Sequence, residues 1–263
     1  MRGVNNYVRP IVADIGNQTL FIYNTIGLMD LSLYAIRISE AFMFDCFLDS
    51  SAKVATSEMY DGWCSILGTK NPYIDSYYGL FMDGDHIFKF LNIFINNMTP
   101  EEKSIIYHLE KNNVIRYLKK ERRYEILKDH SFIFINGFLC STDGISREIT
   151  LMHELSHLFY QTDKEYRKYI NAAYQRTGRV YQELVIQKLI SKLDPTEARV
   201  EDEWAAYLID NKKLFVPLRR YSRFDTDLVY KHFAKKLAKM TNIRGTKNNL
   251  LIKTMTRVKK ETQ

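Results

Sequence analysis

Cysteine is scarce in this sequence and shows no regular spacing. Cys46, Cys64 and Cys140 are scattered through 263 residues. They form no CxxC pair and are odd in number, which excludes a cysteine-based metal site and a disulfide framework. Such sparse usage suits a reducing compartment. We expect Cys140 to be a small buried hydrophobic residue.

The sequence also lacks a segment for export or membrane insertion. Residues 1–10 have no apolar core and no small-residue cleavage site, so we predict no signal peptide. The most apolar stretch, Leu20 to Leu48, is interrupted by four charged residues and is not expected to form a transmembrane helix. We therefore expect a cytoplasmic protein, or one delivered into another cell by a dedicated export system.

Acidic residues are almost absent from the C-terminal region. Residues 231–263 hold ten Lys or Arg against the single acid Glu261, so this region carries +9 of the total net charge of +7 and the rest of the chain carries −2. Such a tail can bind nucleic acid, an anionic membrane or an acidic partner. A solvated amphipathic helix with a frayed end also explains it. We favour that interpretation, since no aromatic stacking pattern or groove-reading motif accompanies the lysines.

The most informative motif is His153-Glu154-Leu155-Ser156-His157, an HExxH pattern within an apolar stretch that can be helical. Four residues apart on a helix, both imidazoles project from one face and can bind the same ion. Glu154 lies beside them and can take a proton from a water molecule on that ion. Zinc with three protein ligands keeps a fourth position for water and lowers its pKa to about 7. The motif therefore predicts a Zn²⁺ site with Glu154 as the catalytic base.

Two histidines need a third protein ligand, and several acids follow them. Glu203 lies on a helix predicted to begin near Asp194, and the small Ala206 on the same face permits close packing. Asp163 has a spacing that some zinc peptidases use, although it also suits a helix cap. Glu183 and Glu201 are further alternatives. We favour Glu203.

Local signals indicate a helix-rich α+β fold with a small sheet next to the HExxH helix. Residues 131–136 form the best predicted strand, whose edge could pair with an extended peptide. A helix is predicted from Pro100 to about Arg122, a loop over 140–146, and a helix start at residues 162–165. We predict a mostly helical region over 1–123, a catalytic core over 124–225, and a basic amphipathic helix and tail over 226–263, all in one compact unit.

The segment Arg147-Glu-Ile-Thr-Leu-Met-His-Glu-Leu-Ser-His157 resembles the Arg-x-Phe-Thr-Leu-Ala-His-Glu-Leu-Gly-His segment of ImmA/IrrE-type zinc metallopeptidases. Glu203-Trp-Ala-Ala206 and Leu214-Phe-Val-Pro217 look like the family's later Glu-x-x-Ala and Leu-Leu-Met-Pro elements. The resemblance covers about residues 130–217. It implies a minimal gluzincin-like zincin fold, with Glu203 as third ligand. Isolated HExxH domains also occur in bacterial effector and toxin proteases.

Together these features predict a zinc-dependent endopeptidase that cleaves an intracellular protein substrate, as a regulatory or effector-type protease. Candidate donors to the reaction's oxyanion are Tyr207, Tyr221 and His232, with Arg219 and Arg220 as weaker candidates. The alternative is a nucleic-acid-associated protein, or an inactive zincin-like binding protein, that uses its basic tail.

Overall fold

The computed structural model describes residues 8–25, 78–93, 96, 98, 100–190, 200–210, 212–245 and 249–262. Over these residues the protein is a mixed α+β chain, as the sequence predicts. Cys46, Cys64 and the helix start near Asp194 lie outside the described residues. No helix of the described ranges is both long and apolar enough to cross a membrane.

The chain divides into two compact units, which differ from the three predicted regions. The first consists of Met1–Ile145 with Thr241–Lys247, and the second of Ser146–Met240 with Asn248–Gln263. The division falls between the predicted strand and the HExxH helix. A short strand near residue 241 returns to the first unit before the chain re-enters the second.

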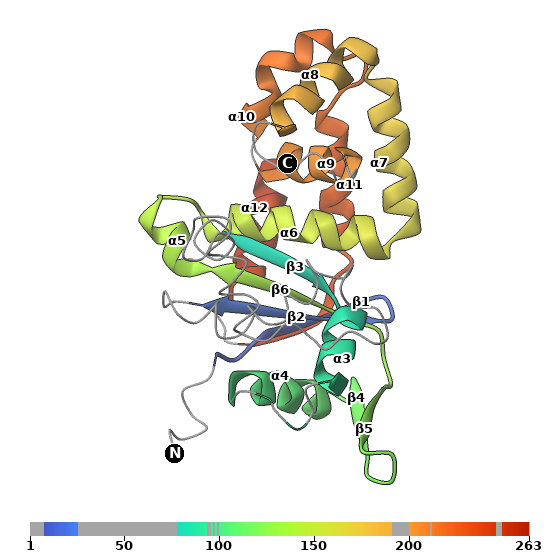
Figure 1. The fold of residues 1–263 in the computed structure, drawn as a ribbon. Helices are drawn as coiled ribbons and strands as arrows, with labels where there is room; N and C mark the ends of the chain where they lie inside the picture. Colours follow the sequence, from blue (N-terminus) through green and yellow to red (C-terminus); the bar gives the residue numbers. More distant parts are fainter. Residues whose placement is uncertain are drawn as a thin grey trace, which may run out of the picture. The chain divides into compact units, whose positions relative to one another are not determined.

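A five-stranded sheet forms the centre of the first unit, in the order β3-β6-β2-β1-β7. Its strands are β1 (Ile11–Ile15), β2 (Gln18–Thr25), β3 (Gly79–Asp83), β6 (His130–Asn136) and β7 (Thr241–Arg244). Strands β2 and β6 are parallel, whereas the other neighbours are antiparallel. Figure 1 shows the strands in this arrangement.

Strand β6 confirms the predicted strand at residues 131–136 but not its predicted use as an edge. All seven of its residues are buried. It pairs with β2 on one side and with β3 on the other. Because both edges of β6 are already hydrogen-bonded, it cannot accept an extended peptide as an added strand. The predicted pairing of residues 132–136 with substrate is therefore wrong.

The remaining elements of this unit include both helices and strands. They are α3 (Gly84–Ile93), α4 (Pro100–Lys111), β4 (Ile115–Leu118), β5 (Arg123–Ile126) and α5 (Gly137–Thr142). The described part of 1–123 is thus shared between strands and helices. Helix α5 occupies the start of the predicted loop over 140–146, and Cys140 is buried within it, as expected.

Helix α4 begins at Pro100 as predicted but ends at Lys111, well before Arg122. The Asn112 side chain donates a hydrogen bond to the His108 carbonyl at 2.8 Å, and Asn113 has a φ of 54°. Asparagine tolerates this left-handed conformation, which stops a helix. The chain then turns into the β4–β5 hairpin instead of continuing as a helix.

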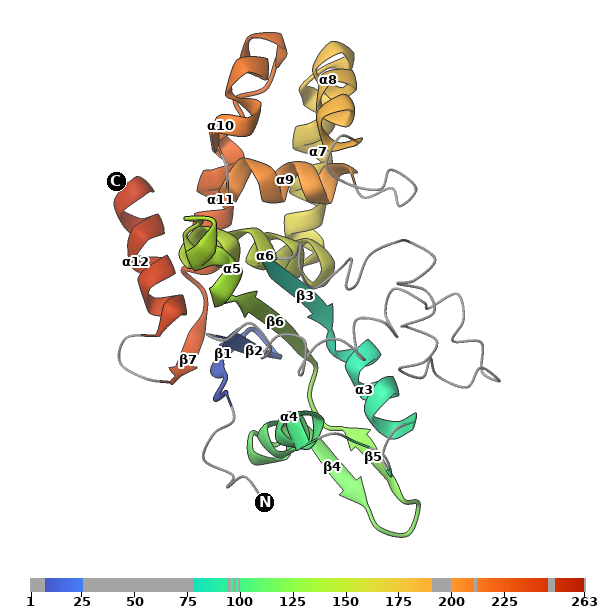
Figure 2. The same cartoon turned by 60° about the vertical axis from the view of Figure 1, so that its left-hand side comes forward.

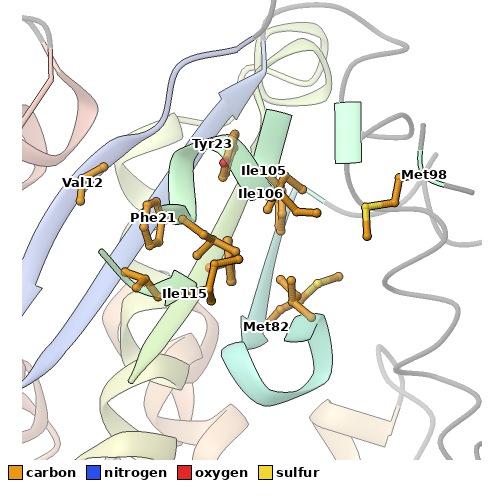
Figure 3. Packing of buried hydrophobic residues seen from close by; sticks show 13 residues of the cluster. Val12, Phe21, Tyr23, Met82, Met98, Ile105, Ile106 and Ile115 are labelled. Atoms are coloured by element: carbon orange, nitrogen blue, oxygen red, sulfur yellow. The ribbon is translucent and has the colours of Figure 1, made fainter. Parts of the chain in front are cut away.

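Aromatic and branched side chains form the core of the first unit. Figure 3 shows Val12, Phe21 and Tyr23 of the sheet together with Ile105 and Ile106 of α4. The rings of Phe21 and Tyr23 stack on those of Phe132 and Phe134, with centroids 5.4 and 5.3 Å apart. These cross-strand pairs fix the register of the parallel β2–β6 ladder, because a slip of one residue would turn them away from α4.

The second unit is helical. Its elements are α6 (Arg147–Thr162), α7 (Lys164–Arg176), α8 (Arg179–Ile190), α9 (Val200–Asp210), α10 (Lys212–Phe215), the 3₁₀ helix η3 (Val216–Tyr221), α11 (Asp227–Leu237) and α12 (Leu250–Thr262). Helix α9 packs on α6 and also contacts α7, α8, α10 and α11 (Figures 1 and 2). Gly178, with a φ of 92°, separates α7 from α8 where the sequence predicts a break.

Most of the basic C-terminal region belongs to the fold of the second unit, and residues 241–247 belong to the first. The apolar residues Val229, Phe233 and Leu237 of α11, and Met240 just after it, are buried, as an amphipathic helix requires. Residues 250–262 then form α12, which contacts α6 and α11 and buries Leu251 and Val258. The expected frayed end is therefore wrong over residues 249–262. Most basic residues of α11 and α12, such as Lys231, Lys253 and Lys259, are exposed, whereas Lys236 is buried and pairs with Asp163.

Removing the buried face of α12 should destabilise the second unit. We expect Leu251→Ala, at a fully buried position, to lower the free energy of unfolding by about 2–4 kcal/mol because it leaves a cavity. The exposed Lys253→Ala on the same helix should change it by less than about 0.5 kcal/mol. Urea unfolding followed by circular dichroism measures both, and equal effects would contradict this role of α12.

Candidate metal centre

Helix α6 presents the HExxH motif because its opposite side is anchored in the core. Leu151, Leu155 and Leu158 are fully buried, so the helix cannot rotate without exposing them. His153 and His157 occupy another face, where their side chains remain 16% and 14% exposed. Their rings lie edge to face with centroids 4.7 Å apart. The predicted projection of both imidazoles from one face is therefore confirmed.

Helix α9 brings Glu203 to the two histidines. Trp204 and Ala206 are fully buried, and the Trp204 Nε1 donates to the Tyr181 hydroxyl on α8 at 3.1 Å. This anchor holds one side of α9 against its neighbours. Helix α9 packs on α6, and the small Ala206, three residues after Glu203, is buried as expected from the sequence. Glu203 is then directed toward the histidine pair.

Three ligand atoms converge between the helices. The Nε2 atoms of His153 and His157 are 3.0 Å apart, and they lie 3.9 and 3.8 Å from the two carboxylate oxygens of Glu203. Ligand atoms at about 2.0–2.1 Å from a tetrahedral zinc ion lie roughly 3.4 Å from one another. The three separations lie on both sides of that value. Two imidazoles and one carboxylate also form a common donor set of catalytic zinc, so these residues fit the ion.

Carboxylates on α9 orient both imidazoles. The Nδ1 of His153 lies 2.7 Å from Asp210 Oδ2, and the Nδ1 of His157 lies 2.9 Å from Asp202 Oδ1. A carboxylate accepts a proton, so each Nδ1 is the donor and each Nε2 is directed at the ligand cluster. Gln161, one turn after His157, donates to the second oxygen of Asp202 at 2.9 Å. Asp202 is only 2% exposed, and both of its oxygens have partners.

The same carboxylates set the protonation of the site. Burial lowers the pKa of His157, but the charges of Asp202, Glu203 and Glu154 outweigh it and raise this pKa to about 10. For His153, burial is likewise outweighed by Asp210, and its pKa is also raised. Two protonated Nε2 atoms cannot face each other at 3.0 Å, so at most one Nε2 carries a proton in addition to the two Nδ1 protons. A metal ion would bind both Nε2 atoms in their unprotonated form.

Glu154 lies beside this cluster on α6. Its residue is only 6% exposed, and its charge raises the pKa of both histidines. Tyr207, one turn after Glu203 on α9, places its ring edge to face with His153, with centroids 5.0 Å apart. The structure thus brings Glu154 and Tyr207 to the predicted ligands.

The alternative ligands lie in other surroundings. Asp163 caps α7, since its Oδ1 accepts from the backbone N–H groups of Glu165 and Tyr166. Its Oδ2 binds the Lys236 ammonium at 2.6 Å. Glu183 is exposed and paired with Arg179 on α8. In the described ranges, the cluster of potential ligand atoms within 4.8 Å of one another contains Glu203 but neither Glu201 nor these acids.

The other predicted oxyanion donors contact different residues. Tyr221 is 41% exposed and lies beneath the Arg220 guanidinium, while Arg219 pairs with Asp227. His232 stacks on Tyr169, with ring centroids 3.9 Å apart, and on Tyr166 at 5.6 Å. Burial and neighbouring lysines lower its pKa. Among the predicted oxyanion donors, Tyr207 is thus the one that packs against a candidate metal ligand, His153.

Sequence reasoning missed Asp202, Asp210 and Gln161 as orienting residues, although their spacing carries a signal. Asp210 follows Glu203 by seven residues, two turns along the same helical face. Gln161 follows His157 by four residues. Asp202 directly precedes Glu203, and its adjacent position on α9 gave no indication that it faces His157. Comparisons of the chain with protein-family models, curated proteins and solved structures found no match.

Zinc retention should distinguish the third-ligand alternatives. We expect Glu203→Ala to lose most of the bound zinc, because two imidazoles and water are a weak set of ligands. Asp163→Ala should retain zinc, but its free energy of unfolding should fall by about 1–3 kcal/mol. The substitution removes a helix cap and the partner of a buried lysine. Metal analysis after dialysis and urea unfolding test both. Loss of zinc from the Asp163 variant alone would contradict the Glu203 assignment.

Orientation of His157 should contribute to metal affinity. Asp202→Asn keeps the size of the side chain but replaces an anionic acceptor with an amide, so we expect zinc affinity to fall by about 10–100-fold. The matched change Asp227→Asn, at an acid paired with Arg219, should leave affinity unchanged. Competition with a chromophoric chelator measures the affinities. Equal affinity in the two variants would show that Asp202 does not orient the ligand.

Proposed function

We propose that this protein is a zinc-dependent endopeptidase acting on a protein substrate. The observation that carries the proposal is the convergence of His153, His157 and Glu203 from two helices, with Glu154 beside them. A purely structural metal site has no need of a further buried carboxylate next to its ligands. The resemblance of residues 147–157 to the ImmA/IrrE-type metallopeptidases supports the same reaction class.

The chain's residues have separate roles in this proposal. His153, His157 and Glu203 would hold the zinc ion, which lowers the pKa of water and polarises a carbonyl group. Glu154 would accept the proton of the attacking water and pass it to the nitrogen of the leaving amine. Asp202 and Asp210 would keep both histidines in the tautomer that ligates through Nε2.

Tyr207 is the donor that we propose for the oxyanion formed on the substrate carbonyl. Its ring packs against the ligand His153, and it lies one turn from Glu203 on α9. A phenol hydroxyl can donate a hydrogen bond to developing negative charge. Tyr221 and His232 have other neighbours, so they have no role in this proposal.

Glu154→Gln should separate hydrolysis from metal binding. Because the substitution preserves side-chain size and leaves the three ligands intact, we expect zinc content near that of the wild type. Hydrolysis should fall by at least roughly 10²–10⁴-fold, the effect of losing a general acid–base group. Incubation with a proteome-derived peptide library, followed by mass spectrometry of new N-termini, measures cleavage without a known substrate.

The matched control is Glu183→Gln, which removes an exposed glutamate paired with Arg179 on α8. It should cleave the library like the wild type. If Glu154→Gln also produced wild-type cleavage, the proposed mechanism would be refuted. If the zinc-loaded wild type cleaved neither the library nor intact proteome extracts, the site would instead be a metal-binding module without peptidase activity.

A further inference from the structure

The β4–β5 hairpin of the first unit carries a dense group of cations. Its two strands pair in register over residues 115–126, and the turn at 119–122 joins them. Residues 116–126 contain five basic and two acidic side chains, which give a net charge of +3. Figure 2 shows this turn at the free end of the two-stranded ribbon.

The base of the hairpin is anchored while its turn is solvated. Ile115 is 2% exposed, and Tyr124 packs against the hydrophobic core of the unit. The Tyr124 backbone N–H also donates to the Asn92 side chain of α3 at 2.7 Å. In contrast, all four residues of the turn at 119–122 are exposed and charged. The turn thus extends from a fixed base.

Ion pairs within the hairpin neutralise its two acids. Arg116 binds Glu125 across the strands through Nε at 2.7 Å, and Arg123 binds Glu121 at 2.6 Å. Three further cations lie in the turn, namely Lys119, Lys120 and Arg122. In the described part of the chain, these three side chains have no ion-pair partner. The cation excess is therefore concentrated at the turn.

Arg122 ends the turn in a backbone conformation that most side chains disfavour. Its φ is 54°, in the left-handed region. Glycine adopts this conformation freely, whereas other L-residues are disfavoured there by roughly 1–2 kcal/mol. Strained positions on a solvated turn concentrate at binding sites. An arginine here offers a planar guanidinium with donors suited to phosphate.

We propose that the β4–β5 hairpin binds the phosphate backbone of double-stranded nucleic acid. A two-stranded ribbon is narrow enough for the duplex major groove, which is about 12 Å wide. All four residues of the turn are charged, whereas the exposed Tyr117 and Ile126 lie on the strands behind it, so the turn itself offers cations and not an apolar wedge or a stacking ring. Contacts to phosphate carry no sequence information, so binding through them would be independent of sequence and strongly dependent on salt.

The test uses the full-length chain and two labelled 20-base-pair DNA duplexes of unrelated sequence. The hairpin variant replaces Lys119, Lys120 and Arg122 with Gln. Its matched control replaces Lys231, Lys235 and Lys239, exposed lysines in and just after α11, and removes the same charge. Affinity is measured by fluorescence anisotropy between about 50 and 200 mM salt. Thermal melting verifies that both variants are folded.

We expect the wild type and the control variant to bind both duplexes with similar affinity. The hairpin variant should bind at least about tenfold more weakly at the lower salt concentration. The slope of its log affinity against log salt concentration should be less steep by about two to three, since each lost phosphate contact reduces the magnitude of the slope by about 0.9.

Several results would overturn the proposal. If the wild type bound neither duplex, double-stranded nucleic acid would be excluded as the partner. The same conclusion would follow if the wild type bound phosphatidylserine–phosphatidylcholine vesicles but neither duplex. Equal weakening of both variants would indicate a net-charge effect, and weakening of the control alone would assign binding to the α11 lysines. If poly-glutamate displaced the labelled duplex as effectively as unlabelled duplex does, an acidic protein would be the favoured partner. Strong preference for one duplex would exclude recognition through the backbone alone.

Discussion

The contact between α6 and α9 is the constraint on which the candidate site depends. Helix α9 supplies one candidate ligand and both carboxylates that orient the histidines, so its rotation sets the distances from these carboxylates to His153 and His157. Asp202 is nearly inaccessible to solvent and would be costly to bury without its histidine and glutamine partners. The Trp204–Tyr181 hydrogen bond and the contacts of α9 with four other helices hold this rotation. Packing far from the ligands therefore affects their geometry.

The features predictable from sequence are those with local causes. The spacing of His153 and His157 on an apolar helix determines their shared face without reference to other segments. Asp163 caps the next helix because its carboxylate reaches N–H groups two and three residues ahead. Glu203 could be favoured but not assigned, because 45 residues, which include the whole of α7 and α8, separate it from His157. The partners of Asp202 and Asp210 depend on the same long-range packing.

The errors arose where distant segments override local propensity. Residues 116–123 contain lysine, arginine and glutamate, which favour helices, yet the Tyr117–Tyr124 and Arg116–Glu125 pairs select a hairpin. The local sequence predicts strand β6. Its second neighbour, β3, begins about 50 residues earlier in the chain, so the sequence around β6 does not indicate that both edges of β6 are paired. The β1–β2 hairpin, in contrast, has a local sequence signal for its turn. Gly16-Asn17 lies between two apolar runs, and Gly16 has a φ of 57°.

The chain crosses between the two units three times, because β7 of the first unit lies between α11 and α12 of the second. No single cut yields both units intact. A fragment ending at residue 145 would leave β1 without β7 and expose a row of unpaired backbone groups, while a fragment of residues 146–263 would carry β7 without its partner. Exposed strand edges promote association between chains. Dissection of this protein therefore requires circular permutation or a linker that replaces residues 241–247.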